Sequence, residues 1–137
     1  MKRVLLPLLL VVALLGVAVV GYWMKRPLEA QTVACANPLA GCPFTHHGAP
    51  ARVTFSTQPA PMEAFELHVT AHAAKNGSAE FQMVGMDMGF NRYDLHRAAG
   101  NGFSARVTLP ACVSGRRDWI LTLEIDGSRY AIPFKAR

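Results

Sequence analysis

The chain has 137 residues, of which 51% are hydrophobic and 17% are charged, and its formal net charge is +5. This composition excludes an intrinsically disordered chain, which would be rich in charge and poor in apolar residues. The positive charge does not indicate nucleic-acid binding, because residues 28–137 hold ten basic and nine acidic residues without a basic stripe. We therefore expect one folded domain with an appendage and no nucleic-acid partner.

The first predicted element is a transmembrane helix, and we assign residues 1–26 to an N-terminal anchor. Residues 4–20 contain no charged or polar side chain, and an aromatic pair precedes the basic residues Lys25 and Arg26. A run of about 20 apolar residues matches the thickness of a bilayer core, and aromatic residues favour its interface. The alternative is a cleaved signal peptide, whose apolar core is usually shorter and ends at a small-x-small site.

The orientation of this anchor is predicted from its flanks and from the cysteines. Two basic residues lie on each side of the apolar run, and the N-terminal amine adds to the first side, which favours a cytoplasmic N-terminus. The three cysteines all lie beyond the anchor and favour an oxidising compartment for residues 28–137. The short basic opening looks bacterial, so we expect a single-pass protein of the bacterial inner membrane with its C-terminal domain in the periplasm.

Residues 27–50 are predicted to be a tether without regular structure, because four prolines and two glycines interrupt them. Cys35 and Cys42 lie in this tether, and Cys112 lies far along the chain. A disulfide between Cys35 and Cys42 would close a short loop, whereas Cys42 with Cys112 would pin the tether to the end of a strand. The sequence leaves both pairings open.

From residue 51 onward the hydrophobic pattern changes to the period of two that is typical of β-strands. Each predicted strand offers one apolar face, so two sheets can stack, and Trp119 is expected to be the largest core residue. We predict an all-β, immunoglobulin-like β-sandwich of about seven strands over residues 51–137. The predicted strands lie near residues 52–56, 65–72, 80–84, 92–96, 103–109, 119–125 and 130–134.

A methionine cluster after the third predicted strand is the candidate functional site. Met83, Met86 and Met88 fall within six residues, and glycines bracket the last two. In an extended segment Met86 and Met88 point the same way, and thioethers are good ligands for Cu(I) but poor ones for Zn²⁺ or Mg²⁺. Methionine is also common core filler, and the alternation of Met83 with Phe81 favours the core over a ligand role for Met83.

Histidines are the candidates to complete such a site. His46 and His47 lie in the tether ahead of the first predicted strand, where a mobile segment can fold over the loop. His68 and His72 lie on the polar face of one strand, about 13 Å apart at roughly 3.3 Å per residue, which is too far to share one metal. The candidate copper ligands are Met86, Met88, Met83, His46 and His47.

No catalytic motif is present in the sequence. It contains no G-x-S-x-G, no H-E-x-x-H, no P-loop and no G-x-G-x-x-G, and its carboxylates are scattered among turns and strand faces. We therefore predict that the protein is not an enzyme.

Several segments resemble a bacterial family. Residues 86–93 (Met-Asp-Met-Gly-Phe-Asn-Arg-Tyr), 102–105 (Gly-Phe-Ser-Ala) and 109–119, which begin with Leu-Pro-Ala-Cys and end with Asp-Trp, are similar to the YtkA-like and FixH-like group of membrane-tethered periplasmic β-sandwich domains. Members occur with copper handling and respiratory oxidase assembly, and the resemblance covers about residues 51–135. It implies that Met86 and Met88 are the ligand candidates. The chain departs from the family at Phe90, where members frequently have His.

Three functions compete at this point. The first is a membrane-anchored periplasmic protein that binds Cu(I) and passes it to a respiratory oxidase or a chaperone. The second is a non-metal accessory subunit that docks on a larger membrane protein complex. The third is a thiol redox protein that uses Cys112, which no local motif supports. Paired thioethers on an exported domain favour the first function.

Overall fold

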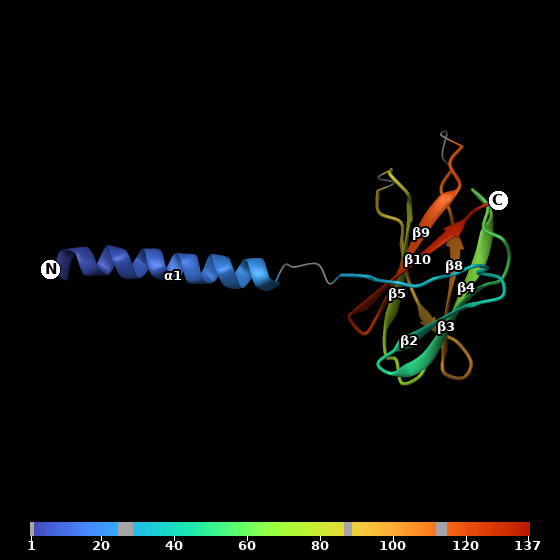
Figure 1. Ribbon diagram of the computed structural model, residues 1–137, viewed down its shortest axis with the longest axis horizontal. Helices are drawn as coiled ribbons and strands as arrows, with labels where there is room; N and C mark the ends of the chain where they lie inside the picture. Colours follow the sequence, from blue (N-terminus) through green and yellow to red (C-terminus); the bar gives the residue numbers. More distant parts are fainter. Residues whose placement is uncertain (1, 25–28, 87–88, 112–114) are drawn as a thin grey trace.

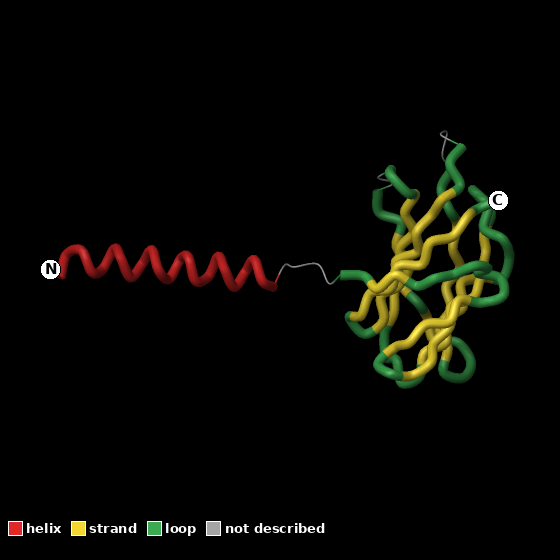
Figure 2. Tube along the Cα trace, in the orientation of Figure 1, coloured by secondary structure: helices red, strands yellow, loops and turns green. Residues whose placement is uncertain are grey.

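The computed structural model describes residues 2–24, 29–86, 89–111 and 115–137, which form one helix and two β-sheets (Figure 1). Helix α1 (Lys2–Met24) stands apart from the sheets in Figure 2. Its stretch Pro7–Met24 has a mean hydropathy of 2.3 and is long and apolar enough to cross a membrane, with none of it buried. Signal sequences meet the same criterion, so the helix fits a membrane anchor and a signal sequence alike.

The described residues beyond the helix form two five-stranded sheets, with the orders β1-β10-β9-β5-β6 and β2-β3-β4-β8-β7. Neighbouring strands are antiparallel, except that β1 runs parallel to β10. The strands are β1 (Gln31–Thr32), β2 (Cys42–His46), β3 (Ala49–Phe55), β4 (Ala64–Ala71), β5 (Gly77–Met83), β6 (Arg92–Asp94), β7 (His96–Arg97), β8 (Gly102–Thr108), β9 (Asp118–Ile125) and β10 (Ser128–Lys135).

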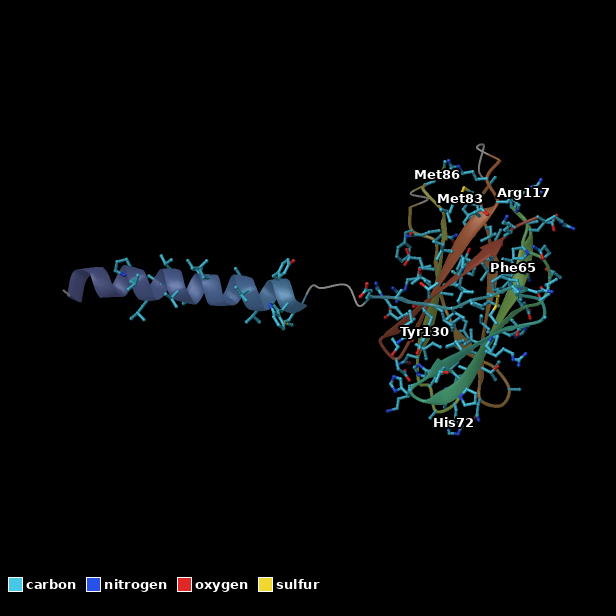
Figure 3. All side chains as sticks on the ribbon, viewed as in Figure 1. Phe65, His72, Met83, Met86, Arg117 and Tyr130 are labelled. Carbon is cyan, nitrogen blue, oxygen red and sulfur yellow. A yellow bond between two sulfur atoms is a disulfide. The ribbon has the colours of Figure 1, made fainter. Side chains whose placement is uncertain are left out.

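The apolar faces of the two sheets pack against each other, as the period-two pattern predicts. Buried and exposed residues alternate along the whole of β4. Rings from opposite sheets are in contact: Phe55 lies 5.1 Å from Phe134 between centroids, and Phe65, labelled in Figure 3, lies 5.9 Å from Phe81. Trp119 is 1% exposed and is the largest fully buried side chain, as predicted.

The predicted β-rich domain is confirmed at the level of two packed sheets. Each of the seven predicted segments contains a strand, and the fourth is divided into β6 and β7. The structure adds β1 and β2, which lie in the segment that the sequence predicted to be a tether.

The prediction of irregular structure is wrong for residues 42–50. Strand β2 pairs with β3 in a hairpin whose register runs from Cys42 opposite Val53 to His46 opposite Ala49. Pro43 is tolerated because β2 is an edge strand. Pro50 is tolerated because the pairing of β3 with β4 begins only at the next residue, Ala51.

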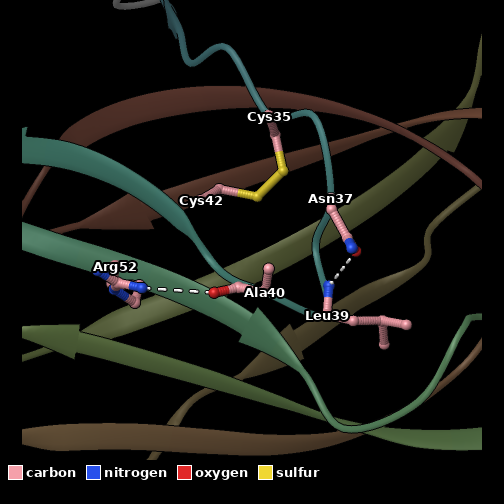
Figure 4. Close-up of a disulfide and its surroundings, with 6 residues drawn as sticks. All are labelled: Cys35, Asn37, Leu39, Ala40, Cys42 and Arg52. Carbon is pink, nitrogen blue, oxygen red and sulfur yellow. Dashed lines mark hydrogen bonds between the residues drawn. A yellow bond between two sulfur atoms is a disulfide. The ribbon is translucent and has the colours of Figure 1, made fainter.

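A disulfide joins Cys35 to Cys42, with 5.1 Å between their Cα atoms (Figure 4). It is one of the two pairings that the sequence left open, and it links the segment after β1 in one sheet to the start of β2 in the other. Inside the enclosed loop, the Leu39 N–H donates to Asn37 Oδ1 at 3.0 Å. Cys112 lies outside the described residues.

We expect reduction of this disulfide to lower the free energy of unfolding by about 2.5 kcal/mol, the loop-closure entropy of a loop this short. Urea unfolding of the full chain in detergent, with and without dithiothreitol, measures the difference. The variant Cys112→Ser should keep the whole effect of the reductant. If that variant loses it, Cys42 pairs with Cys112 and the observed pairing is contradicted.

Candidate functional site

The methionine loop is the turn that leaves β5. Met83 and Met86 face each other as an isolated antiparallel bridge, and the Met86 N–H donates to the Met83 carbonyl at 3.3 Å. Gly85 lies between them with φ of +75°, a left-handed conformation that a glycine adopts without the cost of a Cβ. The sequence therefore forms a tight turn that holds two methionines opposite each other.

Two hydrogen bonds fasten this turn to the segment that leads into β9. The Val84 N–H donates to the Asp118 carbonyl at 3.0 Å, and Arg116 Nη1 donates to the Val84 carbonyl at 3.3 Å. The sequence analysis did not connect Arg116 with the loop. Its role depends on a contact across 32 residues, for which the local sequence carries no signal.

The two methionines differ in exposure. Met83 is 4% exposed, which confirms its interpretation as a core residue, and Met86 is 39% exposed, as expected of a loop residue presented to solvent. The Cβ atoms of directly opposed residues lie about 5 Å apart, which is close enough for both side chains to reach a shared hollow. A hollow of about 440 Å³ is lined by Gln82, Met83, Val84, Gly85, Met86 and Ile120. Met88 lies outside the described residues.

The structure does not bring His46 and His47 to the methionines. His46 is the last residue of β2, and its Nδ1 shares a hydrogen bond of 2.9 Å with the hydroxyl of Tyr130. Strand β9 lies between the strands of Tyr130 and Met83 and measures their separation: Tyr130 pairs with Leu123, and Met83 pairs with Trp119. Leu123 and Trp119 are four residues apart on β9. That separation is about 13 Å along the strand, and Figure 3 shows Tyr130 well away from Met83 and Met86.

The two histidines instead form a cluster with the β9–β10 hairpin. His46 is 3% exposed, and its ring lies 4.2 Å from that of His47 between centroids. Burial lowers the pKa of His46 below its ordinary value, the neighbouring His47 lowers it further, and the Asp126 carboxylate opposes the shift in part. A buried imidazole in this environment is neutral at neutral pH.

Asp126 is a structural residue that the sequence reasoning missed. Its carboxylate accepts hydrogen bonds from the backbone N–H groups of Lys75 and Asn76, at 2.9 to 3.2 Å. These donors lower the pKa of Asp126 and connect the turn before β5 to the turn between β9 and β10. The backbone partners of Asp126 lie about 50 residues away, so the local sequence carries no signal for them.

The donor atoms available for a metal follow from this arrangement. Within the described ranges, no three His, Cys, Asp or Glu side chains are grouped so that they could hold a metal ion. Thioethers are the soft ligands that remain at the loop, and they suit Cu(I) better than hard cations. The described part of the methionine loop therefore offers thioether sulfur, with Met86 at its surface.

No protein-family model, curated protein or solved structure matches this chain. The similarity to the YtkA-like and FixH-like group stays a prediction, and the functional conclusion depends on the geometry of the chain itself.

The lowered pKa of His46 predicts an acid-sensitive fold. As the pH falls below 6.5, the unfolded chain takes up a proton that the buried imidazole resists, so the free energy of unfolding decreases. Urea unfolding of the full chain at pH 7.5 and at pH 5.5 should show this loss, and His46→Gln should reduce it. His72→Gln, which replaces an exposed histidine next to the end of β4, should leave the loss unchanged. An equal loss in the wild type and in His46→Gln would contradict the assignment.

Proposed function

We propose that this chain is a membrane-anchored periplasmic protein that binds Cu(I) at its methionine loop and delivers it for a respiratory oxidase. The observation that carries the proposal is the surface position of Met86, held opposite Met83 by a tight turn and presented at 39% exposure. Thioether sulfur is a favoured ligand of Cu(I). A thioether carries no proton, so it binds the ion independently of pH.

Met86 and Met88 are the proposed ligands. Met88 enters the proposal through its spacing from Met86 alone, because it lies outside the described residues. Met83 lines the same hollow as Met86 and is the third candidate. The hydrogen bonds of Val84 and Arg116 support a ligand role for Met86, because a ligand on a fastened turn loses little conformational freedom when it binds.

Fold and location form part of the same proposal. We take the two packed sheets to be an immunoglobulin-like sandwich of the YtkA-like and FixH-like kind, and helix α1 to remain as an anchor in the bacterial inner membrane. The disulfide between Cys35 and Cys42 supports a periplasmic domain, because disulfides persist in oxidising compartments. In such a compartment, thioethers keep their metal-binding form while thiols are lost to disulfides.

The copper proposal is tested by titrating the full chain in detergent with Cu(I) against a chromogenic Cu(I) chelator. Met86→Leu and Met88→Leu should each weaken the affinity about tenfold or more, which corresponds to about 1.4 kcal/mol. Leucine has nearly the same volume as methionine and removes only the sulfur, so the fold should be kept.

Met62→Leu is the matched control, because it removes a thioether that is 70% exposed outside the loop. It should leave the Cu(I) affinity unchanged. If the double variant Met86→Leu/Met88→Leu binds Cu(I) as tightly as the wild type, the proposed ligand set is wrong.

The anchor is tested by measuring the intact mass of the chain isolated from its own bacterial host. A retained anchor predicts that residues 1–26 are present and that alkaline carbonate leaves the protein in the membrane pellet, because about 20 apolar residues are buried in the bilayer. A soluble protein that begins beyond residue 26 would show that helix α1 is a signal sequence.

A further inference from the structure

The large apolar side chains that the domain leaves exposed all lie at one end of the two sheets. In the described residues beyond helix α1 they are Leu39, Met62, Val84, Met86 and Phe90, which we call the apolar end. Phe90 is 86% exposed and Met62 is 70% exposed. They come from the loops between β1 and β2, between β3 and β4, and between β5 and β6. Isolated exposed apolar residues are normal, but a group from three loops indicates a contact surface.

These side chains are connected by shared hollows in the surface. Leu39 and Val84 line one cleft, Val84 and Met86 line the next hollow, and Met62 and Phe90 line a third. Val84 lines the first two hollows and so connects them, and Phe90 brings the same loop to the third. The exposed apolar residues therefore line hollows at the same end of the sheets.

Two unpaired cations lie beside this surface. Arg116 and Arg117 are exposed, and neither forms an ion pair within the described part of the chain. Arg116 reaches the apolar end directly through its hydrogen bond to the Val84 carbonyl. Nearby, Lys135 lies 3.8 Å from Asp118, so that pair is already neutralised. Both arginines therefore lack a carboxylate partner among the described residues, and Figure 3 shows Arg117 on the same side of the domain as Met86.

A cleft at this end is lined in part by buried aromatic side chains. It encloses about 620 Å³ between the Cys35–Leu39 segment and the neighbouring ends of β9 and β10, and its lining includes Leu39, Trp119 and Phe134.

The opposite end of the sheets has a different character. Its turns carry His47, Lys75, Asn76 and Asp126, and the described residues there include no large apolar side chain with high exposure. The asymmetry indicates that one end is suited to water and the other to a partner.

We propose that the apolar end docks an acidic protein partner, which inserts an apolar side chain into the cleft beside Trp119 and pairs its carboxylates with Arg116 and Arg117. A second copy of this chain is disfavoured, because it would supply the same arginines, Arg116 and Arg117, rather than carboxylates to pair with them. A bilayer surface is disfavoured, because a planar layer of headgroups does not fill a concave cleft. The inference does not require copper. If the proposed function also holds, the same contact places Met86 against the partner.

The test is site-specific photo-crosslinking of the full chain in its own host cells, with p-benzoylphenylalanine in place of Phe90. We expect a discrete protein adduct whose crosslinked peptide contains carboxylates. The same probe in place of His72, which is exposed near the opposite end, should give no such adduct. Adducts with lipid alone, with a second copy of the chain, equally from both positions, or with nothing would each overturn the proposal.

Charge variants test the second half of the inference. Arg116→Glu/Arg117→Glu should reduce the adduct about tenfold, because like charges would then face each other across the interface. Arg116→Lys/Arg117→Lys should retain most of it, and Arg106→Glu, an exposed cation of β8, is the control that should change nothing. Equal yields from all three variants would exclude an acidic partner.

One variant tests the docking proposal independently of the copper proposal. Met86→Leu/Met88→Leu keeps the apolar character of the loop, so it should crosslink as well as the wild type even where Cu(I) binding is lost. A crosslink that disappears in this variant under copper-free conditions would contradict docking through the apolar surface.

Discussion

The contact between the two sheets is the constraint on which the other features of the domain depend. Its centre is a set of aromatic rings, in which Phe81 lies 5.9 Å from Phe65 and 6.1 Å from Phe134 between centroids. These rings come from β4, β5 and β10, so they bring distant parts of the chain together. Full burial of one such ring contributes about 1.5–3 kcal/mol, which is large against the net stability of a small domain.

The methionine loop begins at the edge of this core. Met83 is opposite Trp119 on β9, and Trp119 is opposite Phe134 on β10, so three buried side chains form a row beneath the loop. The turn that carries Met86 is consequently short, hydrogen-bonded to β9 and fixed at its base. A side chain presented in this way has little freedom of its own, which suits the copper site that we propose.

The extent to which the sequence predicted this structure follows from the range of each interaction. The alternation of apolar residues is local, so the strands after residue 51 and the core position of Met83 were predictable. Strand β2 was not, because its prolines are tolerated only at a sheet edge, and edge position is a property of the whole topology. The same omission placed His46 in a mobile tether, whereas pairing with β3 fixes it beside Tyr130.

The candidate site shows the same limit. The methionine spacing and the bracketing glycines were visible in the sequence, and Met86 is exposed as expected. The contacts that fasten the loop were not visible, because Arg116 and Asp118 approach it from a segment about 32 residues away. The disulfide partner of Cys42 was likewise undetermined, because spacing alone permits either pairing.

Arg116, which has no carboxylate partner among the described residues, connects the two proposals through electrostatics. Arg116 Nη1 lies close to the loop, with 3.3 Å to the Val84 carbonyl, so a cation bound at Met86 would be repelled by a neighbouring guanidinium. Carboxylates of a docked partner would neutralise that guanidinium and relieve the repulsion. Cu(I) would then bind more tightly in the complex, and by thermodynamic reciprocity the copper-loaded chain would bind the partner more tightly than the empty chain. After the ion leaves, the complex would lose this extra stabilisation, which favours release of the empty protein.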